Sequence, residues 1–530
     1  MKQKILPFSA RNTDTDHASR VGAVSRRKAL RLSGLVGIGA LAPHLLSACA
    51  GGDEAAVDPR IGFSSPDLAD YSALSWTGAF KAAHDKFSRE YAFGEWKGVD
   101  WPSLYSRYET RIMQAQAAAD ESAYYLALHQ YLFSIPDGHL GLTAKNDAVP
   151  TALAKARAGG GFGMAVAELD DRRVIAAAVI RGGQADLAGI AVGAEIIGWG
   201  GQAARVAIGN IDVGAIPYKI LTGAPGGEAP QATREHYRLE QARLLTRGAI
   251  GDVIEVVFRN PTSPISRTTS LLAVDDGGQT FSLLNFAARP ELSDQIDYRI
   301  LPQGYGYVLV RMELDLTNPA DPTRIYQEFR KAVSSFVSAK VPGVIIDLRG
   351  NYGGSDQLAA DICGFFYATP SFYEAQEYFD KRDGHFLRIT LSERGPDPFV
   401  SELSIMPQSP HYAGPVVVLV NPFTKSSGEG PPLYISQLAR GKVIGFHGTN
   451  GSYGMVGGSI ALPAGYAIEY AFGRSVDQRG RIQLDSRDGV GGVAPNLRVP
   501  MTMDNALAFA AGADVVLDYA ITYLNGSANR

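Results

Sequence analysis

The chain has 530 residues, of which 45% are hydrophobic and 20% are charged. This composition excludes a disordered or fibrous protein and predicts two or three globular domains. The formal net charge is -4 and the body of the sequence has no basic run, so nucleic acid is not an expected partner.

The first 48 residues have the features of an export signal. A basic group at 26–28 precedes an apolar stretch at 32–46, which is the order found in secretory signals. The stretch is shorter than the roughly 20 apolar residues that span a bilayer. The paired arginines resemble a twin-arginine signal, but Ala29 departs from that pattern. The twin-arginine and the general export routes therefore both remain open.

Residues 46–49 read Leu-Ser-Ala-Cys and resemble a bacterial lipobox. In a lipobox the cysteine, here Cys49, takes a lipid and becomes the new N-terminus, which tethers the protein to a membrane. The alternative is a plain cleavable signal with a chance cysteine. Residues 49–65, rich in Gly, Asp, Ala and Pro, are predicted to form a flexible stalk. We therefore expect an exported, lipid-anchored protein of the cell envelope, on the periplasmic side in a Gram-negative cell.

Residues 66–150 are predicted to form a small helical cap. Apolar and aromatic side chains recur at helical spacing at 101–108 and 124–132, with almost no Gly or Pro inside these runs. The last helix should end at the turn-forming string 134–139, which presents His139.

Residues 151–280 alternate short β-rich runs with glycine-bounded turns and resemble a PDZ domain. In this resemblance, Gly161, Phe162 and Gly163 form the loop whose backbone N–H groups capture the terminal carboxylate of a peptide. An insertion at about 208–248 departs from the PDZ pattern and contains a helix-like run. Both a peptide-binding groove and a PDZ fold without a free-peptide role remain open. The expected strands are 173–179, 193–198 and 252–258, and the expected helices are 185–190 and 233–247.

Residues 290–530 interleave apolar strands with helical segments, which predicts an α/β layered core. The runs 341–348 and 414–420 are continuously apolar, as in strands that are buried on both faces. Functional side chains should then follow the carboxyl ends of these strands.

Two strings of residues follow the two strands. The string 347–355 reads Asp-Leu-Arg-Gly-Asn-Tyr-Gly-Gly-Ser. Its glycines allow backbone N–H groups to approach a reacting oxygen, whereas it lacks the lysine of a phosphate-binding loop. The string 421–429 places Ser426 at a strand-to-helix turn, where a serine can act as a nucleophile. Ser426 and Glu429 also have the spacing of a capping box, so this string alone allows both interpretations.

Together, the two strings resemble those of the C-terminal-processing and tricorn-core serine peptidases. The resemblance covers nearly all of the mature chain and implies a multidomain fold: an N-terminal helical cap, a PDZ-like β-rich domain and an α/β layered, crotonase-like peptidase core. It implies that Ser426 attacks the peptide carbonyl. It also implies that the N–H groups of Gly353, with Gly354 as the neighbouring possibility, and of Ser427 bind the oxyanion.

A serine nucleophile requires a base, and the family has two solutions. Members with a Ser-Lys dyad carry a Phe-Gly-Lys string, but the matching region 445–454 has no lysine. Lys425 adjoins the serine, where sequence neighbours usually point apart. Tricorn-like members use the histidine of an Asp-Gly-His string. This string matches residues 137–139 and implies His139 as the general base, with His447 as the second candidate.

A carboxylate should orient the imidazole of the base. Tricorn-like members use a glutamate shortly before a Gly-Val-x-Pro-Asp string near the C-terminus. Here the string is 492–496, ends in Asn and is preceded by aspartates only. The resemblance therefore implies Asp488 for this role, with Asp485 as the alternative.

The sequence suggests neither a metal site nor a cofactor, because no His, Cys and carboxylate spacing matches a metal site. Cys363 lies in an apolar run and is expected to be a small buried side chain. The predicted function is hydrolysis of peptide or protein substrates in the cell envelope through an acyl-enzyme. The alternatives are a noncatalytic peptide- or ligand-binding lipoprotein on the same fold and a PDZ-based envelope scaffold.

Overall fold

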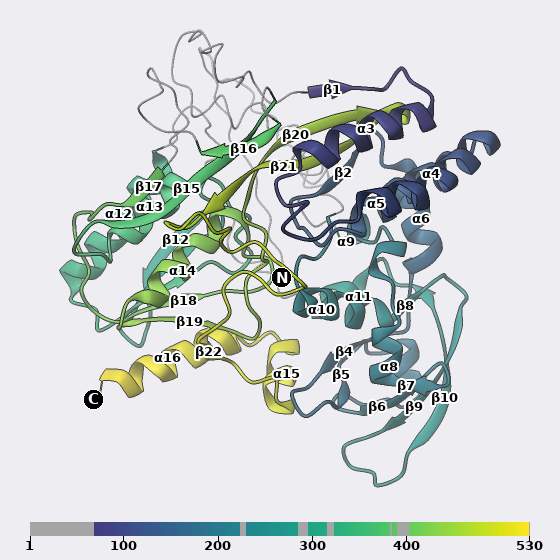
Figure 1. The fold of residues 1–530 in the computed structure, drawn as a ribbon. Coiled ribbons are helices and arrows are strands. Elements are labelled where there is room, and N and C mark those ends of the chain that lie inside the picture. The colour runs from purple at the N-terminus through teal and green to yellow at the C-terminus, as the bar shows by residue number, and fades with distance from the viewer. Residues whose placement is uncertain are drawn as a thin grey trace, which may run out of the picture.

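The computed structural model describes residues 68–222, 229–284, 295–314, 323–381, 384–388 and 402–528. Over these ranges the chain forms a mixed helix and sheet structure with several cores (Figure 1). The predicted export signal 1–48, Cys49 and the predicted stalk lie outside the described residues. In the ranges given, no helix has both the length and the apolar character needed to cross a bilayer.

The N-terminal part is a block of helices. Its main members are α3 (Trp76–Glu90), α4 (Trp101–Ala118) and α5 (Glu121–Phe133). Each begins after a Ser or Asp whose side chain accepts a hydrogen bond from a backbone N–H of the first turn. Their buried faces share one core with two strands from near the C-terminus, and the rings of Phe87 and Tyr470 meet at 5.2 Å. The helix α5 thus ends, at a fixed place, just before the turn that carries His139.

The middle of the chain forms an antiparallel sheet with the strand order β10-β9-β6-β5-β4. The strand β4 lies at the edge of this sheet, and α10 packs beside it. A small sheet, β11-β3-β8, lies next to it. The bounds are β3 (Gly160–Gly161), β4 (Met164–Glu168), β5 (Val174–Val179), α7 (Gln184–Leu187), β6 (Glu195–Trp199), α8 (Ala204–Gly209), α10 (Arg234–Leu245), β8 (Arg247–Gly248), β9 (Val253–Arg259), β10 (Arg267–Leu272) and β11 (Val274–Asp275).

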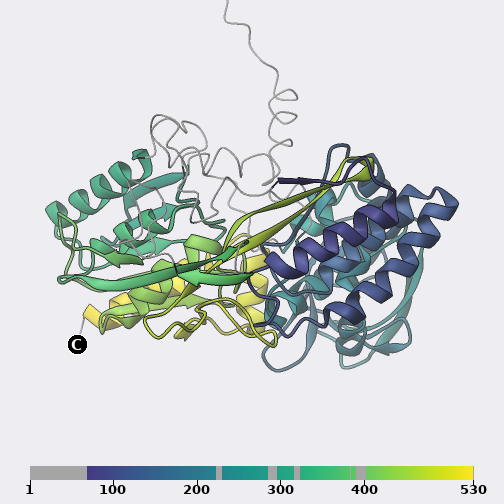
Figure 2. The same ribbon diagram turned by 45° about the horizontal axis from the view of Figure 1, so that its top comes forward.

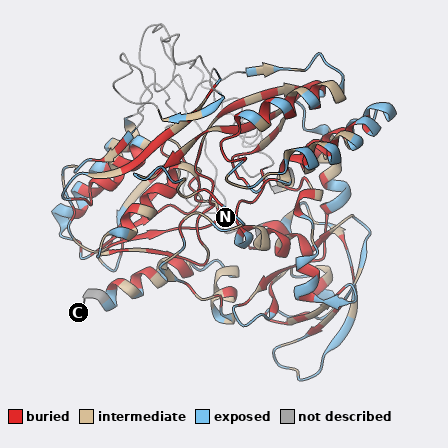
Figure 3. Ribbon diagram, in the orientation of Figure 1, coloured by how far each residue is buried: buried red, intermediate tan, exposed pale blue. Residues whose placement is uncertain are grey.

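The C-terminal part is built on a sheet with the order β12-β13-β14-β18-β19-β22, parallel from β13 onward. Along β14, Val344 and Ile346 face one core while Ile345 faces another, so both faces of the strand are buried (Figure 3). The bounds are β12 (Ile296–Ile300), β13 (Gly306–Val310), α12 (Arg324–Ala339), β14 (Val344–Asp347), α13 (Asp356–Gly364), β18 (Val416–Leu419), α14 (Gly430–Gln437), β19 (Gly441–Gly445), β22 (Leu497–Arg498), α15 (Met503–Ala510) and α16 (Val515–Ala528).

A second sheet joins the helical block to this core. Its long strands β20 and β21 run from one part to the other (Figure 2). Because β20 begins at Gly454, the loop before it lies where the helical block meets the parallel sheet. The bounds are β1 (Leu68–Asp70), β2 (Gly141–Ala144), β15 (Ser371–Asp380), β16 (His385–Arg388), β17 (Glu402–Ile405), β20 (Gly454–Leu462) and β21 (Tyr466–Val476).

Candidate active site

The two strings that the sequence singled out follow neighbouring parallel strands, β14 and β18. Their loops are joined directly. The N–H of Lys425 donates to the carbonyl of Asn351 at 3.0 Å, and the N–H of Gly350 donates to Oδ1 of Asn421 at 3.0 Å. The parallel sheet therefore brings the glycine turn and the serine turn together at one edge.

Ser426 occupies a strained turn. Its φ of +56° lies in the left-handed region, which costs a non-glycine residue roughly 1–2 kcal/mol. Gly353 packs so closely on it that a Cβ on the glycine would lie 2.4 Å from the Cβ of Ser426. The serine and the glycine turn are thus in contact, and a strained serine at a strand-to-helix turn is typical of a nucleophile.

The capping-box interpretation of Ser426 and Glu429 is wrong. The N-cap of the short helix 426–429 is Lys425, and no side chain caps it. The Glu429 carboxylate instead binds the loop before β20. It accepts the hydroxyl of Thr449 and the N–H groups of Gly451 and Ser452, both at 2.9 Å. Burial raises the pKa of Glu429 to about 8.

His139 reaches the same place from the turn after α5. Ser452 links the two parts: its carbonyl accepts the N–H of Ser426 at 3.0 Å, and its hydroxyl accepts the N–H of Gly138 at 2.7 Å. The Nζ of Lys425 also donates to the carbonyl of Gly138 at 3.2 Å. The sequence-predicted nucleophile and base therefore belong to one hydrogen-bonded unit.

The imidazole of His139 is buried and neutral. Burial lowers its pKa to about 4, although the nearby Asp137 opposes this shift. Its Nδ1 lies 3.3 Å from the N–H of Gly454, and its Nε2 has no hydrogen-bond partner among the residues that the structure describes. Oδ1 of Asp137 lies 4.0 Å from Nδ1.

Asp488, the predicted orienting carboxylate, is not in the site. Its side chain is 86% exposed, and its nearest charged neighbour is Arg487 at 4.0 Å. Asp485, the alternative, is buried, pairs with Lys97 at 2.5 Å and accepts the N–H of Tyr453 at 3.0 Å. The chain turns outward after Asp485, so three further residues carry Asp488 to the surface.

Asp137 is the carboxylate beside the base, and the sequence interpretation missed it. It accepts the hydroxyl of Tyr91 at 2.6 Å and the backbone N–H of His139 at 2.8 Å. Burial alone would raise the pKa of Asp137, but Lys97, His139 and these hydrogen bonds together lower it below its usual value. Asp137 is therefore ionised at neutral pH.

The predicted oxyanion donors differ in availability. The N–H of Gly353 donates to Oδ1 of Asn351 at 2.7 Å, so in this state it is not open to a substrate oxygen. Gly354, with a φ of +152°, packs against the backbone of Glu313, and Ser427 is buried next to Asp356. The prediction for Gly353 thus requires Asn351 to release it, whereas Gly354 and Ser427 remain predicted donors.

The predicted carboxylate loop in the middle of the chain is not open. Gly161 lies in the central strand of the small sheet, paired on both sides. The N–H of Phe162 donates to the carbonyl of Thr246 at 3.2 Å, and Gly163, whose carbonyl accepts the N–H of Ile180, turns the chain with a φ of +81°. Internal partners therefore occupy Gly161 and the N–H of Phe162, which disfavours carboxylate capture here, and the peptide-binding role of this loop stays a prediction.

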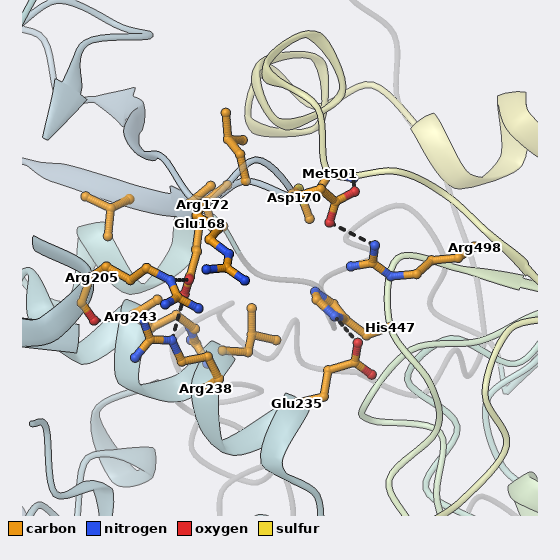
Figure 4. A pocket seen from close by; sticks show the side chains of 16 residues that line it. Glu168, Asp170, Arg172, Arg205, Glu235, Arg238, Arg243, His447, Arg498 and Met501 are labelled. Carbon is orange, nitrogen blue, oxygen red and sulfur yellow. Dashed lines mark hydrogen bonds and ion pairs between the residues drawn. The ribbon is translucent and has the colours of Figure 1, made fainter. Parts of the chain in front are cut away.

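A cavity of about 620 Å³ lies between β4, α10 and the C-terminal core (Figure 4). Arg238 donates to Glu168 at 2.6 Å on one side, and Glu235 meets His447 at 2.9 Å on the other. Neither the predicted nucleophile nor His139 lines it. The second-candidate base, His447, therefore faces this cavity rather than the serine turn.

Two further predictions concern Cys363 and metals. Cys363 is buried in an apolar cluster, and burial raises its pKa, which agrees with a structural side chain. Within the described ranges, no three or more His, Cys, Asp or Glu side chains are arranged to hold a metal ion.

Two solved structures of mature CPAF share this fold. Mature CPAF in complex with lactacystin superposes with a TM-score of 0.56 at 14% identity, over 86% of this chain and 99% of that chain. Mature CPAF alone gives 0.56 and 14%, over 85% and 98%. A photosystem II D1 C-terminal processing protease gives 0.35 and 18%, over 84% and 99%. No curated protein sequence is significantly similar to this chain.

The family assignment comes from the sequence of the C-terminal core. Residues 309–499 match the model of peptidase family S41. The matched range contains both strand-end strings and the loop before β20, and hence the nucleophile turn and everything that Glu429 binds. Over residues 309–499 the chain is therefore similar to peptidase family S41, and the protein is a serine-type peptidase.

Proposed function

We propose that the chain hydrolyses peptide or protein substrates in the cell envelope through an acyl-enzyme on Ser426. The strained Ser426, tied through Ser452 to the turn of a buried neutral histidine, is the observation that carries this proposal. We further propose the division into a helical cap, a PDZ-like domain and a crotonase-like core, and the lipid anchor at Cys49.

The first step forms one bond and breaks another. The Oγ of Ser426 attacks the peptide carbonyl while His139 takes its proton, and the N–H groups of Ser427 and of the Gly353-Gly354 turn stabilise the oxyanion. The C–N bond then breaks, and His139 returns the proton to the leaving amine. Water hydrolyses the ester by the same route in reverse.

Asp137 takes the orienting role in this proposal. While the N–H of Gly454 donates to Nδ1, the neutral ring of His139 carries its proton on Nε2. To accept the serine proton at Nε2, the ring has to carry its proton on Nδ1 and donate it to a carboxylate. Oδ1 of Asp137 is 4.0 Å away, and Tyr91 holds the same carboxylate through Oδ2, so a movement of the ring toward Oδ1 completes the triad.

Casein hydrolysis tests the proposal. The purified chain should release casein peptides, which mass spectrometry can identify, and the Ser426→Ala variant should release none. A correctly folded parent chain that leaves casein and a panel of unfolded proteins intact would count against peptide hydrolysis.

A further inference from the structure

Three buried polar atoms around the serine turn have no hydrogen-bond partner in the part of the chain that the structure describes. They are Nε2 of His139, Nε2 of His236 and Oδ1 of Asn450. All three residues are at most 8% exposed. A buried polar group without a partner is destabilising, and native proteins hold few of them. His139 is explained by the proposed chemistry, but the other two are not.

His236 lies in the first turn of α10 and packs on the core close to Ser426. Its ring meets the ring of Phe423 edge-on at 5.2 Å, and its Nδ1 lies 3.4 Å from Nδ2 of Asn450. An amide nitrogen only donates, so Nδ1 is the acceptor and the neutral ring carries its proton on Nε2. The closest carboxylate oxygen, on Glu240, is 3.9 Å from that nitrogen. His236 therefore presents an unused N–H donor.

Asn450 presents an unused acceptor. Its Nδ2 donates to the carbonyl of Pro422 at 2.8 Å and its backbone N–H to the carbonyl of Thr424 at 2.8 Å, so the residue is fixed against the serine turn. Its Oδ1 lies against Gly138, where a Cβ would come within 2.5 Å of it. The acceptor is thus next to the turn that carries His139.

A donor and an acceptor on two side chains in contact complement a polypeptide main chain, because each residue of a peptide offers one C=O and one N–H. His139 has to protonate the leaving amine, so the residues after the scissile bond lie on its side of Ser426. We propose that Nε2 of His236 and Oδ1 of Asn450 bind the main chain of the substrate on the leaving-group side of the scissile bond. This subsite rests on the proposed function.

The subsite requires the first turn of α10 to separate from the core, because both atoms are closed to water. Besides the contact of His236 with Phe423 and the ion pair of Glu235 with His447, backbone groups make polar contacts across this boundary. The N–H of Arg234 donates to the carbonyl of Gly489 at 2.8 Å, and Glu235 accepts the N–H of Gly448 at 2.9 Å. Contacts of this kind can be exchanged for water or for substrate at little cost.

The test compares two synthetic peptides taken from the best casein cleavage site. The long peptide keeps several residues after the scissile bond, and the short one ends after the first. We expect His236→Leu to lower the ratio of kcat/KM for the long to the short peptide by roughly 10- to 100-fold, because one buried hydrogen bond is lost. His236→Gln keeps a donor and should restore most of the ratio.

His447→Gln is the matched control, because it changes a histidine that faces the cavity and keeps a polar side chain opposite Glu235. It should keep the ratio of the parent chain. Equal losses on both peptides in His236→Leu, or no loss, would overturn the subsite while leaving the proposed function intact. A parent chain that cleaves casein but neither peptide would overturn the subsite alone, whereas a parent chain that leaves casein intact would overturn both proposals.

Discussion

Two regions flank Ser426 and differ in how their buried polar groups are partnered. Behind it, the carboxylate of Glu429 is bound by one hydroxyl and two N–H groups of the loop before β20. On the side of His139, the buried Nε2 of His139, Nε2 of His236 and Oδ1 of Asn450 have no hydrogen-bond partner among the described residues. The first region holds the turn in shape, and the second is incomplete without a substrate. The presence or absence of hydrogen-bond partners for buried polar groups thus distinguishes the scaffold from the reaction site.

The largest effect is expected at Ser426 itself. Ser426→Ala should lower casein hydrolysis by at least about 10⁴-fold, since the other groups act only through this hydroxyl. Its free energy of unfolding should change by less than about 1 kcal/mol, because no capping bond is lost. Ser426→Gly should be as inactive but more stable by about 1 kcal/mol, because glycine relieves the left-handed φ. Denaturant unfolding measures the stability of both variants. A glycine variant that is less stable than the parent would show that the backbone at position 426 is not strained.

A smaller loss of activity is expected for Asp137→Asn. The amide cannot stabilise the imidazolium and can hold the ring in the wrong tautomer, so kcat should fall by roughly 10²- to 10⁴-fold. Asp488→Asn is the matched control and should stay within about twofold of the parent, since its side chain is exposed. If Asp488→Asn were the inactive variant, the sequence prediction would be restored and the role of Asp137 lost.

The region around Glu429 is tested through the pH dependence of the free energy of unfolding. Burial raises the pKa of Glu429 to about 8, so the folded chain keeps this proton over a range where the unfolded chain has lost it. Its contribution to stability is therefore full below about pH 4.5 and is lost as the pH rises to 8. Glu429→Gln cannot ionise, so its thermal unfolding should vary less between pH 5 and 8. Parallel curves for the two proteins would show that the carboxylate is already ionised.

The smallest expected effect is on the pH dependence of the reaction rate of Ser426, whose fall in acid should occur at a lower pH than for an ordinary histidine. Because burial lowers the pKa of His139 to about 4, the base stays neutral well below pH 6.5. The rate of reaction of Ser426 with a fluorophosphonate should be level from pH 8 to about 5.5 and reach half near pH 4. A half-point near 6.5 would mean that the imidazole is hydrated when it reacts.

The sequence predicted the elements that local pattern determines. The apolar runs at 341–348 and 414–420 are confirmed as β14 and β18, and the helix-like run 233–247 as α10, because periodicity and composition decide such segments. The resemblance of the two strings to C-terminal-processing serine peptidases is likewise confirmed by the family match over residues 309–499. The nucleophile and base stay predictions that the geometry supports.

The partners of the buried carboxylates could not be predicted from the sequence pattern. Lys97 and Asp485 pair in the interior although 388 residues separate them, a contact that no local spacing encodes. Asp137 stood inside the Asp-Gly-His string but was taken as a turn residue. Glu429 was interpreted through its spacing from Ser426, yet its partners lie twenty or more residues later, at 449–452. Burial and partner identity decided each case, and both depend on tertiary structure.

The most direct test of the central claim is peptide mapping after the purified chain reacts with a fluorophosphonate probe. We predict a single adduct on Ser426, absent from Ser426→Ala and formed much more slowly in His139→Ala. An adduct elsewhere, or none on the folded protein, would contradict an activated Ser426 and favour a binding role for the same fold.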